Sequence, residues 1–390
     1  MQAITFLMYA GFFMVIPLIS VHYVDKLGFA AAYVGLTLAV RQLTQQGLGV
    51  FGGMIADRIG ARGLIAAGVL IRAVGFISLA WATTPLLLML AMVLSALGGV
   101  LFDAPSRAAL AALAPDEERA RIYAVNGVVS GLAMTSGPLL GALLLRLNFE
   151  WVCIAAAVCF LLVFVITVVL LPPVQVASDK QSLGYGFGLV FHDHIFIIFT
   201  ALLMGYWFLW VQITLSLPLV AQQLTGNNDS VGAVYALNAG LTVILQYPLT
   251  RLVEGRMRPI SVLVLGISLM ALGLGLVALV NSFPGLLACV VIFAVGVVFA
   301  SPTQQTVTAE LADQRALGSY FGINSLSLAL GGSAGNLAGG WLTDVARTSA
   351  MAWLPWLIFC GVGLACAAGM ALLSGHLRAR SSPSAAISAD

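Results

Sequence analysis

The chain has 390 residues, of which 61% are hydrophobic and only 8% are charged, and its net charge is +2. A soluble domain is about 45–50% apolar and about 25% charged, so this chain carries too little charge to cover a surface in water. Most of its surroundings must therefore be lipid, and its small net charge gives no reason to expect a nucleic-acid partner.

Cysteine and histidine usage gives no sign of a metal or redox site. The five cysteines lie inside apolar runs without the close pairing of a zinc or redox motif, and the four histidines lie at or near loops. We therefore expect neither a metal site nor a cofactor. These residues are Cys153, Cys159, Cys289, Cys360 and Cys366, and His22, His192, His194 and His376.

Apolar runs of bilayer length follow one another along the chain. A helix that crosses the hydrocarbon core needs about 20 apolar residues. The runs are separated by Gly, Pro and charged residues, and they predict an all-α integral membrane protein with twelve spans. The predicted spans are residues 3–22, 31–54, 63–82, 85–108, 122–146, 151–171, 194–222, 231–251, 260–280, 284–306, 318–343 and 351–374.

The stretch LPPVQVASDKQSLGYG interrupts this pattern between the sixth and seventh spans with two prolines and several polar residues. It predicts two six-helix bundles, residues 1–172 and 194–376. A cytoplasmic linker at 173–193 would join them, and a cytoplasmic tail at 377–390 would follow.

Lysine and arginine predict the orientation, because loops rich in them stay in the cytoplasm. The loops of one side carry only Lys26, Arg146 and Arg347. Both termini are therefore expected on the other side, in the cytoplasm. That side carries Arg58, Arg62, Arg119, Arg121, Lys180, Arg251, Arg256, Arg258, Arg315, Arg378 and Arg380.

The two predicted bundles contain an internal repeat. The stretch FDAPSRAALAALAPDEERARIYAVN in the first half is similar to FASPTQQTVTAELADQRALGSYFGIN in the second. Two halves with the same orientation are therefore expected, related by an axis along the membrane normal. Phe102, Pro105, Asp116 and Tyr123 pair with Phe299, Pro302, Asp313 and Tyr320, and Asn126, Gly137 and Gly141 pair with Asn324, Gly335 and Gly339.

Three motifs carry a resemblance to a known family. GGMIADRIGARG, residues 52–63, resembles the loop between helices 2 and 3 of the major facilitator superfamily, except that Ala61 replaces a basic residue. GFFMVIP and SGPLLGA resemble helix 1 and helix 5 of its drug:proton antiporter branch. The resemblance covers the whole chain, and stretches such as ALGGVLFDAPSRAAL are similar to one multidrug-resistance group within that branch. It implies a transporter rather than an enzyme, located in the bacterial inner membrane and acting on a small molecule, and we expect a monomer.

Two departures from the family pattern put the usual proton route in doubt. Ser95 stands where the family's helix 4 has an arginine, and the first span lacks the acidic residue that drug antiporters often carry there. Other charged residues must then take over this role.

Apart from Arg146 and Arg251, which end their spans, four charged residues lie inside predicted spans: Arg41, Arg72, Asp103 and Arg107. A charge in the bilayer centre is costly, by about 2.5–3.5 kcal/mol on insertion scales, so such groups normally face a protein interior or a water-filled cavity. Arg41 is expected either to line the cavity or to bond to neighbouring helix carbonyls. For Arg72 we favour snorkelling or structural pairing.

Asp103 is the leading candidate for proton coupling, with Arg41 and Arg107 as its modulators. Proton antiport requires a carboxyl group that changes protonation as the cavity changes sides, and Ala300, its counterpart in the repeat, cannot ionise. The alternative is an internal ion pair between Asp103 and Arg107, one turn apart. Glu310 is the second candidate carrier, or else a solvated residue at the cavity mouth.

Aromatic and amide side chains predict the substrate surface. Aromatic faces with a few amides accept flat, amphipathic or cationic molecules. Trp207 fits an anchor at the lipid interface equally well. The candidates are Gln42, Gln45, Tyr206, Trp210, Gln212, Asn238, Gln246, Gln304 and Asn324.

Two further sets of residues are assigned to conformational change. Small residues one turn apart let helix backbones approach closely, and this set consists of Gly137, Pro138, Gly141, Gly335 and Gly339. The charged loop is predicted to act as a latch, in which Asp57 meets the positive N-terminal end of the eleventh helix. The latch consists of Gly53, Asp57, Arg58, Gly60 and Arg62.

The function favoured by these features is proton-coupled efflux of small amphipathic compounds by alternating access, driven by the proton gradient. The alternative within the same fold is a transporter for an organic acid or a sugar-like metabolite, because Arg outnumbers acidic residues inside the first-half spans. An enzyme lacks support from any nucleophile, paired carboxylates or metal cluster, and the paired halves disfavour a simple channel.

Overall fold

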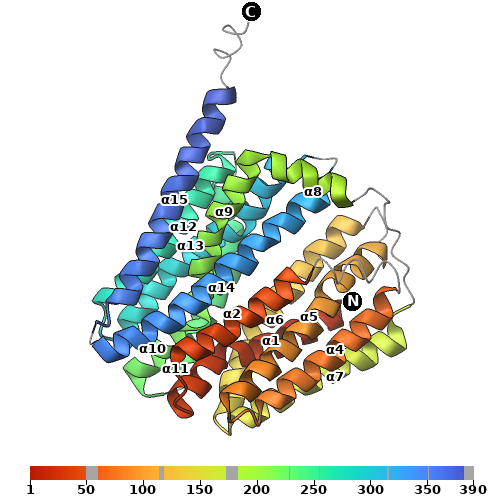
Figure 1. Ribbon diagram of the computed structural model, residues 1–390, viewed down its shortest axis with the longest axis vertical. Coiled ribbons are helices and arrows are strands. Elements are labelled where there is room, and N and C mark those ends of the chain that lie inside the picture. The colour runs from red at the N-terminus through yellow and green to blue at the C-terminus, as the bar shows by residue number, and fades with distance from the viewer. Residues whose placement is uncertain are drawn as a thin grey trace, which may run out of the picture. The chain divides into compact units, whose positions relative to one another are not determined.

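The computed structural model describes residues 1–49, 60–113, 118–172, 183–227, 229–253, 255–313, 316–349 and 351–381, and every element within these ranges is a helix. The first half contains α1 (Gln2–Ser20) with the π-helix η1 (Val21–Lys26), followed by α2 (Ala31–Gly47), α4 (Ala61–Leu79), α5 (Pro85–Leu113), α6 (Arg119–Leu145) and α7 (Phe149–Leu170). These helices correspond one to one to the first six predicted spans (Figure 1).

The second half repeats this plan after a short helix, α8 (Leu183–His192), which hydropathy alone did not predict inside the linker. The seventh span is divided into α9 (His194–Trp210), the 3-10 turn η2 (Val211–Ile213) and α10 (Ser216–Thr225). The remaining spans are α11 (Asp229–Val253), α12 (Pro259–Leu276) with η3 (Val277–Leu279), α13 (Phe283–Leu311), α14 (Leu317–Ser349) and α15 (Leu354–Ser381).

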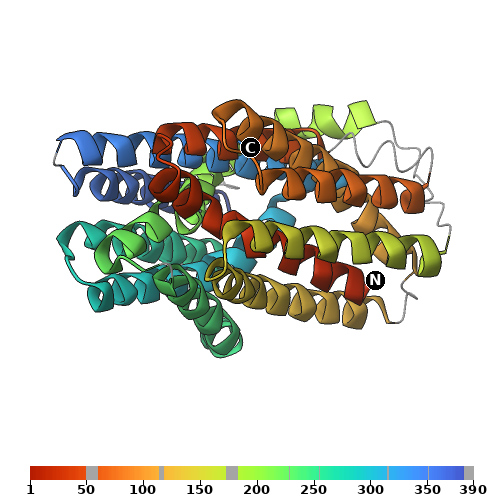
Figure 2. The same ribbon diagram turned by 90° about the horizontal axis from the view of Figure 1, so that it is seen from below.

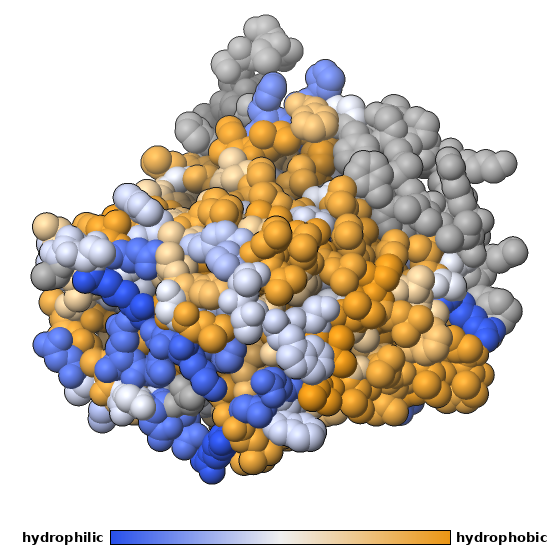
Figure 3. Space-filling view, turned by 60° about the horizontal axis from the view of Figure 1, so that its bottom comes forward, coloured by the Kyte–Doolittle hydropathy of each residue, from blue (hydrophilic) through white to orange (hydrophobic). Residues whose placement is uncertain are grey.

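Ten of the described helical segments are long and apolar enough to cross a membrane. The two spans outside this set are α2, which has 17 residues, and α14, which is the longest described helix at 33 residues. Large apolar side chains lie exposed on the outward faces of the helices, among them Leu170 at 72% and Ile244 at 69%. Figure 3 shows such side chains as a broad apolar surface, with hydrophilic residues gathered toward one end. Because an aqueous surface would not tolerate this area of exposed Leu, Ile and Val, the solvent of this face is lipid.

The contacts divide the chain into two compact units. Unit 1 consists of Met1–Lys180, Val211–Gly240 and Ser333–Met351, and it therefore includes α10 and the ends of α11 and α14 from the second half. Within it α4 packs between α5 and α7, and α1 packs on α6 and α7 (Figure 2). Unit 2 consists of Gln181–Trp210, Leu241–Gly332 and Ala352–Asp390, in which α12 packs on α13 and α15.

The internal repeat is visible in how the helices pack. In unit 1, a Cβ added to Gly98 of α5 would lie 2.5 Å from the carbonyl oxygen of Gly68 in α4. In unit 2, a Cβ added to Gly296 of α13 would lie 2.6 Å from the carbonyl oxygen of Gly266 in α12. The two pairs are equivalent at a shift of 198 positions, one more than the shift that pairs Phe102 with Phe299. Each half therefore brings its third and fourth helices into backbone contact through the same two glycines.

Two of the predicted packing glycines join α6 to α1. A Cβ added to Gly137 would lie 2.8 Å from the carbonyl oxygen of Ala10, and one added to Gly141 would overlap the carbonyl oxygen of Met14. Both contacts lie inside the first half, so these glycines fix α1 against α6. Gly137 and Gly141 lie one turn apart on the same side of α6, which also contains Pro138. This spacing of small residues allows the close approach of the two helices.

We expect Gly141→Ala to destabilise the protein, because the added methyl group must push α6 away from the α1 backbone. The expected loss is about 1–3 kcal/mol, the usual cost of overpacking. Gly131→Ala on the same helix is the matched control, because a Cβ there meets nothing within 4 Å, and it should be neutral or stabilising by up to about 1 kcal/mol. Thermal unfolding of both variants in detergent measures the difference. Equal melting temperatures would show that α6 and α1 are not in close contact.

Candidate functional site: a buried charge cluster in the first half

Three helices of unit 1 bring charged and amide side chains together around Asp103. Asp103 lies in α5, and its Oδ2 accepts a hydrogen bond of 2.7 Å from Nε2 of Gln45 in α2. Nη1 of Arg72 in α4 lies 4.0 Å from the other carboxylate oxygen. The Asp103 side chain keeps 32% of its surface exposed, whereas that of Arg72 keeps 4%. The carboxylate is thus held by a neutral amide and a buried cation while one side stays open.

Arg41 extends the cluster along α2. Its Nη1 donates to Oε1 of Gln45 at 2.7 Å, and its Nη2 donates to Oε1 of Gln42 at 3.1 Å. The guanidinium carbons of Arg41 and Arg72 lie 5.1 and 4.7 Å from the centroid of the same ring, that of Phe12 in α1. Phe12 therefore provides a π-face for both cations.

Glycines of α5 make room for the residues that hold Asp103. A Cβ added to Gly98 would lie 2.6 Å from the backbone nitrogen of Arg72, and one added to Gly99 would lie 2.7 Å from Cδ of Gln45. Gly99 precedes Asp103 by one helical turn, so the same face of α5 carries both the space and the carboxylate. The stretch SALGGVLFD thus supplies both the carboxylate and the glycines that leave space for Arg72 and Gln45.

The described part of the cluster contains two guanidinium groups and one carboxylate, so it carries a charge of +1 when Asp103 is ionised. Arg41 and Arg72 are only 8% and 3% exposed, and the Nε atom of each is buried without a hydrogen-bond partner among the described residues. A buried charge is expensive unless it is paired or hydrated. The cluster is therefore chemically suited to exchange a proton or to attract a polar ligand.

The structure brings together four of the residues singled out for coupling and binding: Asp103, Arg41, Gln42 and Gln45. Arg107 and Glu310 are both exposed, and the described carboxylate contacts of Asp103 go to Gln45 and Arg72 rather than to Arg107. The expectation that Arg72 snorkels does not hold, because its side chain is buried. The expected structural pairing does hold, and its partner is Asp103. Phe12 was missed, and only its place on an apolar first helix could have pointed to it.

Aromatic side chains of α9 form a chain of edge contacts in unit 2. Tyr206 and Trp207 lie 4.8 Å apart between ring centroids, and Trp207 and Trp210 lie 5.7 Å apart. Tyr206 is fully buried, whereas both tryptophans are half-buried. The tryptophans are therefore the members of this group that have surface left for a ligand.

The predicted amide side chains differ in their burial and in their hydrogen bonds to the rest of the protein. Gln212 is fully buried; its Nε2 donates to the carbonyl oxygen of Gly335 at 3.0 Å, and its Oε1 accepts from Ser216 at 2.7 Å and lies beside Gly339. It therefore fastens η2 to α14. Oε1 of Gln304 and Oδ1 of Asn324 are buried without a partner among the described residues. Asn238 and Gln246 are half-buried on α11.

Most of the predicted latch lies outside the described residues: this holds for Gly53, Asp57 and Arg58. Gly60 has a φ of +86°, a backbone conformation that favours glycine. Nη2 of Arg62 donates to the carbonyl oxygen of Val168 at the end of α7. This hydrogen bond joins the start of α4 to the last turn of α7, the last helix of the first half.

Long lipid-facing helices arranged as a repeat, with buried charges inside one half, define an α-helical membrane transporter of the two-bundle type. No group of His, Cys, Asp or Glu that could hold a metal ion occurs among the described residues. The chain belongs to the Major Facilitator Superfamily, whose family model matches residues 3–336. The resemblance inferred from GGMIADRIGARG and SGPLLGA is thereby confirmed.

Relatives of known name are similar over nearly the whole chain. Multidrug resistance protein MdtH of Yersinia enterocolitica is 41% identical over 360 residues, which cover 92% of this chain and 90% of the relative. The protein of the same name from Aeromonas hydrophila is 40% identical over 354 residues, covering 91% and 89%. The finer resemblance to one multidrug-resistance group is therefore confirmed.

Solved structures with much lower identity share the fold. The nucleoside transporter NupG has a TM-score of 0.79 at 15% identity, with 95% of this chain and 97% of the other covered. A POT family transporter in complex with 5-aminolevulinic acid has a TM-score of 0.80 at 14% identity, with 96% and 95% covered. These likenesses concern the fold alone.

Proposed function

We propose that this protein exports small amphipathic compounds, drugs among them, across the inner membrane in exchange for protons. It would do so by alternating access of one central site to the two sides of the membrane. The similarity to proteins named multidrug resistance protein MdtH supports the substrate class. The buried cluster around Asp103 supports proton coupling.

The single observation that carries the coupling is the set of contacts that Asp103 makes. Its carboxylate lies against one amide and one cation, and about a third of its side chain is exposed. A proton arriving there removes the negative charge beside Arg72 and weakens the hydrogen bond from Gln45, which in turn accepts a hydrogen bond from Arg41. One protonation step therefore changes contacts on α2, α4 and α5 together.

The substrate would meet aromatic and amide groups of the second half. Trp207 and Trp210 offer partly exposed ring faces, and Gln304 and Asn324 have buried oxygen atoms that lack partners. A flat molecule with a cationic or hydrogen-bonding group satisfies both kinds of surface. We further propose that both termini are cytoplasmic, as the Lys and Arg distribution indicates, and that the transporter works as a monomer.

Transport by the purified protein tests the proposed function. We expect proteoliposomes to concentrate a fluorescent lipophilic cation when the pH gradient favours exchange, and to lose this activity when a protonophore abolishes the gradient. Protein-free liposomes give the background. Accumulation that is indifferent to the protonophore would remove the proton from the proposal.

The alternative substrate is an organic anion, and the two arginines against one carboxylate favour it. An anion would compete with Asp103 for Arg41 and Arg72, so protonation of Asp103 would strengthen anion binding. Proton and anion would then move in the same direction, as in symport. A cation instead competes with the proton for Asp103, which gives antiport. The direction of the proton flux that accompanies each substrate therefore distinguishes the two functions.

A further inference from the structure

The end of α14 repeats the pattern of the charged loop after α2. Residues 53–57 read GMIAD, and residues 340–344 read GWLTD, so both stretches have Gly, any residue, an aliphatic residue, a small residue and Asp. An arginine follows in each case, Arg58 in the first stretch and Arg347 in the second. The first stretch comes after α2 in the first half and the second lies within the last turns of α14 in the second half, and the proposed orientation places them on opposite faces of the membrane.

Asp344 caps a helix from the other half. Its Oδ1 accepts a hydrogen bond of 3.0 Å from the backbone nitrogen of Ala31, and its Oδ2 accepts one of 2.8 Å from that of Ala32. These are the first two residues of α2, and Ala30, which precedes them, offers no side-chain cap. A carboxylate at a helix N-terminus gains from both the charge-assisted hydrogen bonds and the helix dipole. Asp344 thus supplies from α14 the cap that α2 lacks locally.

Glycine allows the two helix backbones to touch below this cap. A Cβ added to Gly35 of α2 would overlap the carbonyl oxygen of Asn336, and one added to Gly340 of α14 would overlap that of Ala31. One turn deeper, Oγ of Ser333 donates to the carbonyl oxygen of Ala39 at 3.1 Å. Contacts between α2 and α14 thus recur at Ala31, Gly35 and Ala39, and at the two glycines the backbones approach too closely for a side chain to fit between them.

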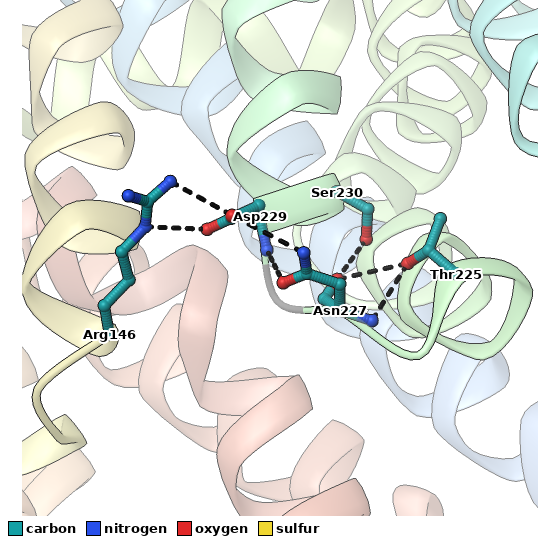
Figure 4. Close-up of polar contacts among 5 residues, drawn as sticks. All are labelled: Arg146, Thr225, Asn227, Asp229 and Ser230. Carbon is teal, nitrogen blue, oxygen red and sulfur yellow. Dashed lines mark hydrogen bonds and ion pairs between the residues drawn. The ribbon is translucent and has the colours of Figure 1, made fainter.

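Two ion pairs at the same end differ sharply in burial. Nη2 of Arg347 lies 2.6 Å from Oδ1 of Asp25, whose side chain is only 15% exposed. Arg146 and Asp229 also bridge the two halves with two hydrogen bonds (Figure 4), but their side chains are 64% and 43% exposed. Exposed pairs contribute little to stability. The contacts that hold this end are therefore Asp344 on α2 and, beside it, Arg347 on Asp25.

We propose that Asp344 is a gating residue: its cap on α2 keeps the outer face closed, and its release is a required step of each transport cycle. The proposal rests on the proposed alternating access. Asp57, which the sequence predicts as a latch at the other membrane face, lies outside the described residues, so the proposal stands on Asp344 alone.

Chemical labelling from outside tests the gate. Ser333 is 3% exposed and lies inside the α2–α14 contact, so Ser333→Cys reports whether that contact opens. We replace the five native cysteines first and retain the background only if it transports like the wild type. A membrane-impermeant maleimide is then added to right-side-out vesicles. We expect Asp344→Asn to raise the labelling rate about tenfold, because the amide keeps one acceptor but loses the charge.

Two further variants keep the test decisive. Asp229→Asn is the matched control, an Asp→Asn change at the same end whose ion pair is exposed, and it should leave labelling within about twofold of the background. Gly340→Ala opens the same contact by steric overlap rather than by charge, so it should also raise labelling if Asp344→Asn fails to fold. Wild-type labelling rates in both Asp344→Asn and Gly340→Ala would overturn the proposal. Increased labelling in a protein that exports nothing would instead reject the proposed function and leave the gate standing.

Discussion

Asp103→Asn is expected to abolish concentrative efflux while leaving passive exchange of substrate intact. Asparagine keeps the size of aspartate and can still accept a hydrogen bond from Gln45, but it cannot take up and release a proton. Exchange of one proton for one monovalent cation moves no net charge, so only the pH difference drives it. This supplies about 1.36 kcal/mol, or about a tenfold concentration ratio, for each pH unit. For a neutral compound the membrane potential adds about 2.3 kcal/mol per 100 mV.

The measurement uses proteoliposomes with an imposed difference of one pH unit and a fluorescent cation. The wild type should approach a tenfold ratio, whereas Asp103→Asn should equilibrate at a ratio of one and still exchange labelled for unlabelled substrate. Glu310→Gln tests the other carboxylate considered for this role, and it should accumulate like the wild type because Glu310 is exposed. Retained accumulation in Asp103→Asn with loss in Glu310→Gln would transfer the coupling role to Glu310.

Hydropathy and charge predicted the helices well because membrane insertion acts on each span separately. The twelve predicted spans all correspond to helices, and the repeat reappears in the glycine pairs of α4–α5 and α12–α13. Asp103 could be singled out because an acidic residue inside a span is costly by itself. What could not be predicted is which side chains meet it. Gln45 is 58 positions away on another helix, and only the packing of α2 on α5 at Gly99 brings it there.

Arg72 shows where reasoning from a single helix fails. Its position inside the third span left both snorkelling and structural pairing open. The glycine pair Gly68 and Gly98 lets α4 approach α5 so closely that Arg72 becomes buried beside Asp103. Similarly, the sequence predicts a packing role for Gly335 and Gly339 of α14 but does not single out Gly340. That Gly340 touches Ala31 depends on tertiary structure, and the sequence pattern GWLTD becomes meaningful only once Asp344 is found on the N-terminus of α2.

The charge count of the cluster predicts an unusual rescue. Removing Asp103 leaves Arg41 and Arg72 as two like charges around Phe12, whereas removing Arg41 leaves the Arg72–Asp103 pair. Asp103→Asn should therefore lower the stability, and adding Arg41→Gln to it should restore part of the loss. Leaving a fully buried charge without its partner costs about 3–5 kcal/mol. Because the Asp103 side chain is 32% exposed, solvent screening reduces the expected loss to about 1–2 kcal/mol.

Thermal unfolding in detergent of the wild type, the two single variants and the double variant gives a double-mutant cycle that measures this rescue. If charge balance decides the stability, Arg41→Gln alone should cost little, and the double variant should melt above Asp103→Asn by a few degrees. Arg107→Gln is the matched control, because Arg107 follows Asp103 by one turn on the same helix but is exposed. It should not rescue Asp103→Asn. Additive effects in the Arg41 cycle, without rescue, would mean that water or an anion already compensates the arginines, and the anionic substrate would then become the favoured one.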